Sequence, residues 1–170
     1  IITKISQPPI MEKFDFIHDF ENYKNEEFKN ILSIEVVTLK RKIKIALYCD
    51  CCGNYESCTI LKRNKLIIAK FNTIYEIELN TSRARHIVFS DMAGVIGLYD
   101  VNDGYLIHGE MCLVKTDYNL NKLWDFYGKD ILISKNGDSN ITVTKDKIEL
   151  TDFEGNPYEI DLTDVFKQQA

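Results

Sequence analysis

Apolar and polar residues alternate along most of the chain, in short runs rich in β-branched residues. In residues 42–49, for example, Ile43, Ile45 and Leu47 alternate with Lys44 and Ala46. A period of two is typical of a strand with one buried face. The runs that we predict as strands are 34–39, 42–49, 59–61, 66–71, 74–79, 84–90, 95–100, 105–116, 122–126, 131–134, 141–144, 147–151 and 158–162.

Turn residues separate these runs at short intervals. The turn signals are Arg63-Asn64, Asn72-Thr73, Asn102-Asp103-Gly104, Asn136-Gly137-Asp138 and Glu154-Gly155-Asn156-Pro157. Short strands joined in this way predict an antiparallel meander of hairpins, arranged as an open twisted sheet or a sandwich. A βαβ fold would need helical segments between the strands, and the sequence pattern predicts none there.

One segment near the start has helical spacing instead. Large apolar residues recur there at roughly helical spacing, with acids and lysines between them: Phe16, Phe20, Tyr23, Phe28, Ile31 and Leu32. With Asp19 as its N-cap, this segment predicts one N-terminal amphipathic helix over residues 19–32. The prolines at positions 8 and 9 disfavour helix before it. We therefore expect a flexible tail over residues 1–10 and a single β-rich domain over residues 11–170.

A weak internal repeat accompanies the strands. Residues 74–79 read IYEIEL, residues 157–162 read PYEIDL, and LWDF at 123–126 has a comparable place in its own unit. Each follows an upstream strand, as in the blades of a β-propeller, although three irregular units are too few to close one.

Alternation assigns the acidic residues of these units to one side of each strand. If the units lie side by side, their carboxylates form an acidic stripe on the solvent face. The partner-binding candidates are Glu76, Glu78, Asp125, Glu159 and Asp161. The alternative is that these charges only keep the outer faces of the sheets solvated.

The charge balance fits a protein partner better than nucleic acid. Acidic residues outnumber basic ones by 26 to 21, which gives a net charge of −5, whereas general nucleic-acid binding requires a basic face. No apolar run reaches the length of about 18 residues that would span a membrane, and the first residues lack the pattern of a secretory signal. The odd number of cysteines fits a secreted disulfide framework poorly. We therefore expect a cytoplasmic location and no membrane partner.

Residues 48–58 read YCDCCGNYESC and hold most of the cysteines. A structural zinc site needs four ligands, commonly in two close pairs, and no second CxxC follows. Cys49, Cys52 and Cys58 would bind zinc only if the fold brought Cys112 or a histidine such as His86 to them. A redox CxxC normally begins a helix. We favour a structural loop with reduced thiols, and a zinc-binding or metal-dependent protein is the alternative.

His108 and Glu110 form the other candidate pair. A carboxylate two residues along the same strand can orient an imidazole for acid–base chemistry, but isolated polar pairs are common in sheets, and we interpret His108 as structural. The patterns GxxxxGK[ST], GxGxxG, HExxH and GxSxG are absent. The sequence therefore predicts a protein that is not an enzyme.

Three segments in the later part of the chain are distinctive: HGE at 108–110, W-x-F-x-G-x-D-I at 124–131, and I-x-L-x-D-x-x-G-x-x-Y at 148–158. These segments resemble a group of uncharacterised β-rich bacterial proteins from toxin–immunity gene neighbourhoods. The resemblance covers about the C-terminal third of the chain. It implies an immunity protein that neutralises a basic toxin, for example a nuclease, by direct binding. The acidic stripe would then pair with the cationic surface that the toxin uses for its substrate.

Overall fold

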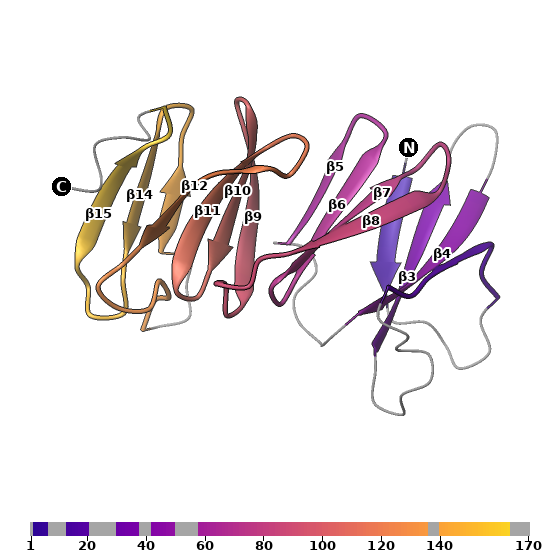
Figure 1. Cartoon of the computed structure of the whole chain (residues 1–170), viewed down its shortest axis with the longest axis horizontal. Helices are drawn as coiled ribbons and strands as arrows, with labels where there is room; N and C mark the ends of the chain where they lie inside the picture. The colour runs from indigo at the N-terminus through magenta and orange to yellow at the C-terminus, as the bar shows by residue number, and fades with distance from the viewer. Residues whose placement is uncertain are drawn as a thin grey trace. The chain divides into compact units, whose positions relative to one another are not determined.

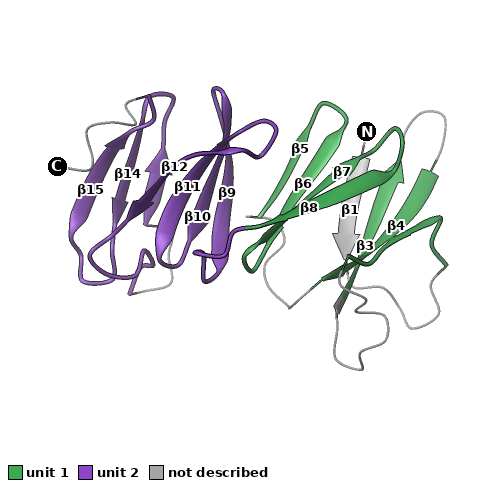
Figure 2. Ribbon diagram, viewed as in Figure 1, with its two compact units in different colours: residues 1–88 green, residues 89–170 purple. Residues whose placement is uncertain are grey.

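The computed structural model describes residues 2–6, 13–20, 30–37, 42–49, 58–135 and 140–163. All regular secondary structure in these ranges is β-strand, and neighbouring strands pair mostly in antiparallel fashion. The prediction of a mainly β protein is therefore confirmed. The chain divides into two compact units, residues 1–88 and 89–170, where the sequence predicts a single domain (Figure 2).

The first sheet of unit 1, sheet A, has the strand order β1-β3-β4-β2. Its strands are β1 (Ile2–Ser6), β2 (Phe16–His18), β3 (Asn30–Val37) and β4 (Lys42–Cys49) (Figure 1). Strand β2 runs parallel to β4, and the other pairs are antiparallel. Where the sequence predicts a flexible tail over residues 1–10, the segment Ile2–Ser6 pairs with β3.

The prediction of an N-terminal helix over residues 19–32 is wrong. The described ranges contain no helix, and residues 30–32 open strand β3. Residues 21–29, the middle of the predicted helix, lie outside the described ranges. The buried apolar residues of β3 alternate along the strand: Leu32, Ile34 and Val36. Their pairing with β4 outweighs the local helical spacing, because tertiary context overrides weak propensities.

The second sheet of unit 1, sheet B, is a meander in which neighbouring strands are consecutive in the chain. Its strands are β5 (Thr59–Lys62), β6 (Lys65–Lys70), β7 (Thr73–Glu78) and β8 (Arg83–Val88). One face of sheet B packs on sheet A. The core between the two sheets consists of Leu32, Ile34, Val36, Ile43, Ile45, Leu47, Cys49, Leu66, Ile68, Tyr75, Ile77 and Leu79. These side chains alternate along their strands, as the sequence pattern predicts.

Unit 2 repeats the same construction with sheets C and D. Sheet C consists of β9 (Val95–Val101), β10 (Gly104–Gly109), β11 (Cys112–Asp117) and β12 (Lys122–Tyr127). Sheet D consists of β13 (Ile141–Val143), β14 (Lys147–Thr151) and β15 (Pro157–Asp161). The core between them consists of Val101, Leu106, Leu113, Leu132, Ile148, Leu150, Ile160 and Leu162. Among the described residues, sheet D has three strands where sheet C has four.

Two predicted strands of unit 2 differ from the structure. The run 105–116 is interrupted by a turn at Glu110 and Met111, which separates β10 from β11. The run 131–134 is not a strand, because its backbone bonds to a turn and not to a neighbouring strand. The amide of Leu132 donates to the carbonyl of Glu110 at 2.6 Å, so this segment is fastened to the β10–β11 turn.

Candidate partner-binding surface

Sheet D buries one face and exposes the other. Ile148, Leu150 and Ile160 are at most 3% exposed and lie in the core of unit 2. The residues between them on β14 and β15 are exposed: Glu149, Thr151, Pro157 and Glu159. This separation follows from the KIELT and PYEID patterns, because successive side chains of a strand point to opposite faces.

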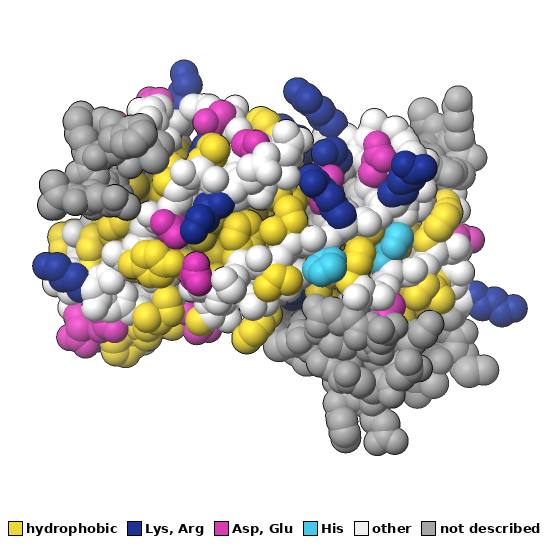
Figure 3. Space-filling view, viewed as in Figure 1, with side chains coloured by type: hydrophobic (Ala, Val, Ile, Leu, Met, Phe, Trp, Pro, Cys, Tyr) yellow, Lys and Arg dark blue, Asp and Glu magenta, His cyan; other side chains and the backbone are white. Residues whose placement is uncertain are grey.

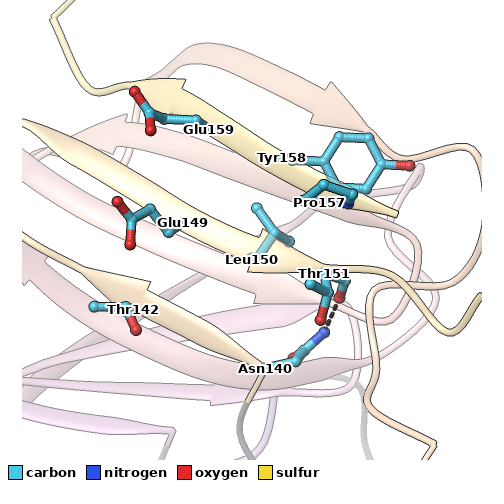
Figure 4. Close-up of a pocket in the computed structure, with 8 residues that line it drawn as sticks. All are labelled: Asn140, Thr142, Glu149, Leu150, Thr151, Pro157, Tyr158 and Glu159. Carbon is cyan, nitrogen blue, oxygen red and sulfur yellow. Dashed lines mark hydrogen bonds between the residues drawn. The ribbon is translucent and has the colours of Figure 1, made fainter. Parts of the chain in front are cut away.

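Three residues form a row across the exposed face. Thr142 on β13 lies opposite Glu149 on β14, which lies opposite Glu159 on β15. The row borders a shallow depression of about 520 Å³, and Figure 4 shows the two carboxylates on neighbouring strands. Asn140 donates a hydrogen bond to the backbone carbonyl of Thr151 at one end of the depression (Figure 4).

Lys147 supplies the positive charge of this face. Its ammonium contacts the carboxylates of both Glu149 and Glu159, the second at 3.3 Å. Hydrogen bonds to Glu149 and Glu159 raise the pKa of Lys147. The side chains of Glu149 and Glu159 are 49% and 70% exposed, so solvent or a partner can reach both.

Together, Glu149, Glu159 and Lys147 carry one negative charge in excess, since two carboxylates share one ammonium. Like charges directly opposite on neighbouring strands repel each other, and an added cation would relieve that repulsion. A lysine or arginine of a protein partner is such a cation, and its side chain can bind a carboxylate with charge-assisted hydrogen bonds. We therefore identify the acidic face of sheet D, defined by Glu149, Glu159 and Lys147, as the candidate surface.

The two predicted partner-binding residues of unit 1 lie on β7. Glu76 is 7% exposed, and its carboxylate contacts Lys65 at 3.1 Å and Arg85 at 2.9 Å. Burial alone would raise the pKa of Glu76, but hydrogen bonds from Arg85 and Lys65 lower it below its usual value. The carboxylate of Glu78 accepts a hydrogen bond from Thr81 at 2.7 Å. Glu76 thus fills a structural role between two cations.

The other three predicted residues belong to unit 2. Asp125 on β12 pairs with Lys122 at 2.8 Å, whereas Glu159 and Asp161 lie together on β15. Asp161 accepts hydrogen bonds from the amide and hydroxyl of Thr163. The structure therefore brings the predicted residues together only in pairs, on β7 and on β15. In the view of Figure 3, Asp and Glu side chains lie among Lys and Arg side chains.

The predicted zinc ligands are only partly within the described residues. Cys49 and Cys58 are buried in unit 1, Cys112 is buried in unit 2, and Cys52 lies outside the described ranges. Burial, with Asp125 and Asp91 nearby, raises the pKa of Cys112 to about 11, which disfavours the thiolate that a metal requires. Within the described ranges no group of three His, Cys, Asp or Glu residues could hold a metal ion. Zinc binding by residues 49–58 stays a prediction.

His108 and Glu110 lie in different surroundings. His108 is 2% exposed, and its Nε2 donates a 2.8 Å hydrogen bond to the carbonyl of Leu132. Burial lowers the pKa of His108 to about 4, so the imidazole is neutral near pH 7. Glu110 is exposed beyond the end of β10. His108 therefore fastens residues 131–134 to sheet C.

Sequence reasoning missed Glu149 and Lys147. Their signal was present in the repeat, because KIEL at 147–150 corresponds to KLII at 65–68, upstream of the two YEI segments. The register was needed to show that Lys147 reaches Glu159, since the two residues are 12 apart in the chain.

No protein-family model matches this chain, and no curated protein matches it in sequence. Among the described residues, no helix is long and apolar enough to cross a membrane.

Proposed function

We propose that this chain is a non-enzymatic binding protein that takes up a basic protein partner on the acidic face of sheet D. The supporting observation is the row in which Glu149 and Glu159 lie opposite each other, exposed, beside a shallow depression. An excess of negative charge on a rigid sheet favours a cationic partner and speeds its association. A broad, shallow surface suits a protein better than a small molecule, which usually binds in a deeper pocket.

The partner class that we propose is a basic toxin, for example a nuclease, which the chain neutralises as a bacterial immunity protein. The resemblance at 108–110, 124–131 and 148–158 supports this role, and the acidic face supplies the charge for it. The protein would act in the cytoplasm, where such a toxin has its target. Neutralisation then results from covering the cationic surface with which the toxin binds its own substrate.

Co-expression with the product of the adjacent gene tests this proposal. We expect that product to arrest growth of a bacterial host, and this chain to restore growth by binding it. The double variant Glu149→Lys/Glu159→Lys should weaken the complex at least about a hundredfold, from two lost charge pairs of about 1.4 kcal/mol or more each. The control is Glu154→Lys, which changes an exposed glutamate in the turn after β14. The proposal fails if the adjacent product does not bind.

A further inference from the structure

The structure turns the weak sequence repeat into a residue-by-residue match between sheets B and D. Strands β6 and β7 of sheet B correspond to β14 and β15 of sheet D, with the same antiparallel register. Lys65 lies opposite Glu78 as Lys147 lies opposite Asp161. The remaining equivalent pairs are Leu66–Ile77 with Ile148–Ile160, Ile67–Glu76 with Glu149–Glu159, and Ile68–Tyr75 with Leu150–Tyr158.

The match extends to a side-chain contact. The ammonium of Lys65 donates to the carboxylate of Glu76 at 3.1 Å, and that of Lys147 donates to Glu159 at 3.3 Å. In both sheets the lysine reaches diagonally to the glutamate two residues before its directly opposite partner. Glu159 is therefore the counterpart of Glu76 in backbone position and in side-chain contact.

The two sheets differ in what lies beyond the glutamate. In sheet B the next strand, β8, pairs with β7 and sets Arg85 opposite Glu76, where the guanidinium donates at 2.9 and 3.2 Å. In sheet D, β15 is an edge strand, and no described residue pairs with its far side. The side chain of Glu76 is 9% exposed, whereas that of Glu159 is 70% exposed.

The backbone of Glu159 points toward this edge. The amide of Leu162 donates to the carbonyl of Asp146 at 2.8 Å, so even-numbered residues of this segment direct their backbone groups toward β14. Backbone groups alternate in an antiparallel pair, so those of Glu159 face the opposite side. An edge of this kind is a template onto which an extended segment can add as a further strand.

A second copy of this chain is a poor occupant. Two β15 edges in antiparallel pairing would set Glu159 and Asp161 of one copy against the same acidic residues of the other, and opposed like charges destabilise a strand pair. Charges and prolines on an edge strand are a common protection against such self-association, and β15 begins with Pro157. The same acidic residues favour a basic strand.

We propose that β15 is the docking edge for an extended, basic segment of a protein partner, which adds antiparallel to it as the fourth strand of sheet D. The inference rests on the proposed function and gives its mode of binding. The segment Arg83-Ala84-Arg85 of β8 indicates which sequence the partner needs. It places arginines opposite Glu78 and Glu76 and a small apolar residue opposite Ile77. The partner therefore carries a basic–apolar–basic sequence, with one cation opposite Glu159.

A peptide with the chain's own sequence from Ser82 to Phe89, SRARHIVF, is the probe. We expect it to bind the full-length chain and to protect the amide of Glu159 from hydrogen exchange, as read by NMR. Glu159→Lys should weaken binding about tenfold or more, and Glu154→Lys should not change it. The peptide SEAEHIVF should not bind. Methylation of the peptide amide aligned with Glu159 should also abolish binding, because the ladder hydrogen bond is lost.

Three outcomes would overturn the inference. They are peptide binding that Glu159→Lys leaves unchanged, protection that appears away from residues 157–161, and an amide of Glu159 that is already protected without peptide. The last outcome would show that the edge is covered within the chain itself. The peptide result is independent of the toxin. If the peptide binds at β15 and the adjacent gene product does not bind, the proposed function fails alone; if the toxin binds without protecting β15, the docking edge fails alone.

Discussion

The hydroxyl of Tyr158 donates a 2.6 Å hydrogen bond to the carboxylate of Asp152, across the turn that joins β14 to β15. The same hydroxyl accepts a hydrogen bond from the amide of Lys129 at 2.9 Å. Asp152 is 2% exposed, and the amide of Asn156 also donates to it. This arrangement fixes the start of β15, the strand that carries Glu159.

The variant Tyr158→Phe should lower stability at pH 7 and reduce its acid dependence. Burial alone would raise the pKa of Asp152, but hydrogen bonds from Tyr158 and Asn156 lower it from 3.8 to about 2. The ionised form therefore stabilises the fold above pH 3.8, and this contribution is lost as the pH falls toward 2. Without the hydroxyl, the folded-state pKa rises, and the loss between pH 4 and 2 becomes smaller.

Urea unfolding of both proteins at several pH values between 2 and 7 measures the change. The matched control is Tyr127→Phe, which removes the hydroxyl of a half-exposed tyrosine. An acid dependence that is equally steep in Tyr158→Phe and in the wild type would contradict the assignment of the lowered pKa to this hydrogen bond.

Lys115 and Asp103 should respond unequally to substitution. Lys115 is 1% exposed, and its ammonium donates a hydrogen bond to Asp103, whose side chain is 68% exposed. Asp103→Ala leaves a largely buried cation without this acceptor and should cost about 1–3 kcal/mol of unfolding free energy. Lys115→Met removes the charge itself and should change stability by less than about 1 kcal/mol. Equal costs in denaturant unfolding would contradict this account.

Glu76 and Glu159 occupy equivalent positions but should differ in their contribution to stability. Glu76→Gln weakens hydrogen bonds to Arg85 and Lys65 at a buried site and should lower the unfolding free energy by about 1–3 kcal/mol. Glu159→Gln changes an exposed group and should cost less than about 0.5 kcal/mol. Chemical denaturation of the two variants measures the difference. A larger loss in Glu159→Gln would mean that Glu159 has a structural role.

Alternation predicted the faces of the strands but not what covers them. Tyr75 and Ile77 are buried on one side of β7, as the sequence predicts. The pattern alone assigned Glu76 to a solvent face, and the structure buries it between Lys65 and Arg85. Alternation with a period of two shows which residues share a side of a strand. It does not show whether a second layer or a neighbouring cation covers that side.

The pairing of distant segments was also beyond local pattern. Strand β1 pairs with β3, and β2 runs parallel to β4, although nothing in the spacing of their residues specifies these partners. The incorrect helix over residues 19–32 has the same origin, because the local helical spacing does not show that residues 30–32 pair with β4 as part of strand β3. The sequence predicted only part of the candidate surface on sheet D. Glu159 followed from alternation, whereas Glu149 and Lys147 could be assigned to the surface only from the register of β14 and β15.

His108 should make the fold less stable as the pH falls from about 6.5 to 4. Burial lowers its pKa from 6.5 to about 4, so the unfolded chain binds a proton in this range that the folded chain does not. The contribution is complete above pH 6.5 and is lost as the pH approaches 4. At about 1.4 kcal/mol per pKa unit, the loss is about 3 kcal/mol.

The variant His108→Gln tests this, because its side-chain amide can still donate to the carbonyl of Leu132. Between pH 7 and 4, we expect the unfolding free energy of the wild type to fall by about 3 kcal/mol more than that of His108→Gln. The control is His86→Gln, which removes a histidine elsewhere in the chain. This variant should lose stability between pH 7 and 4 as steeply as the wild type does. NMR titration of the His108 imidazole gives an independent reading: its resonances should not move above pH 5, and a midpoint near 6.5 would contradict the neutral, buried imidazole.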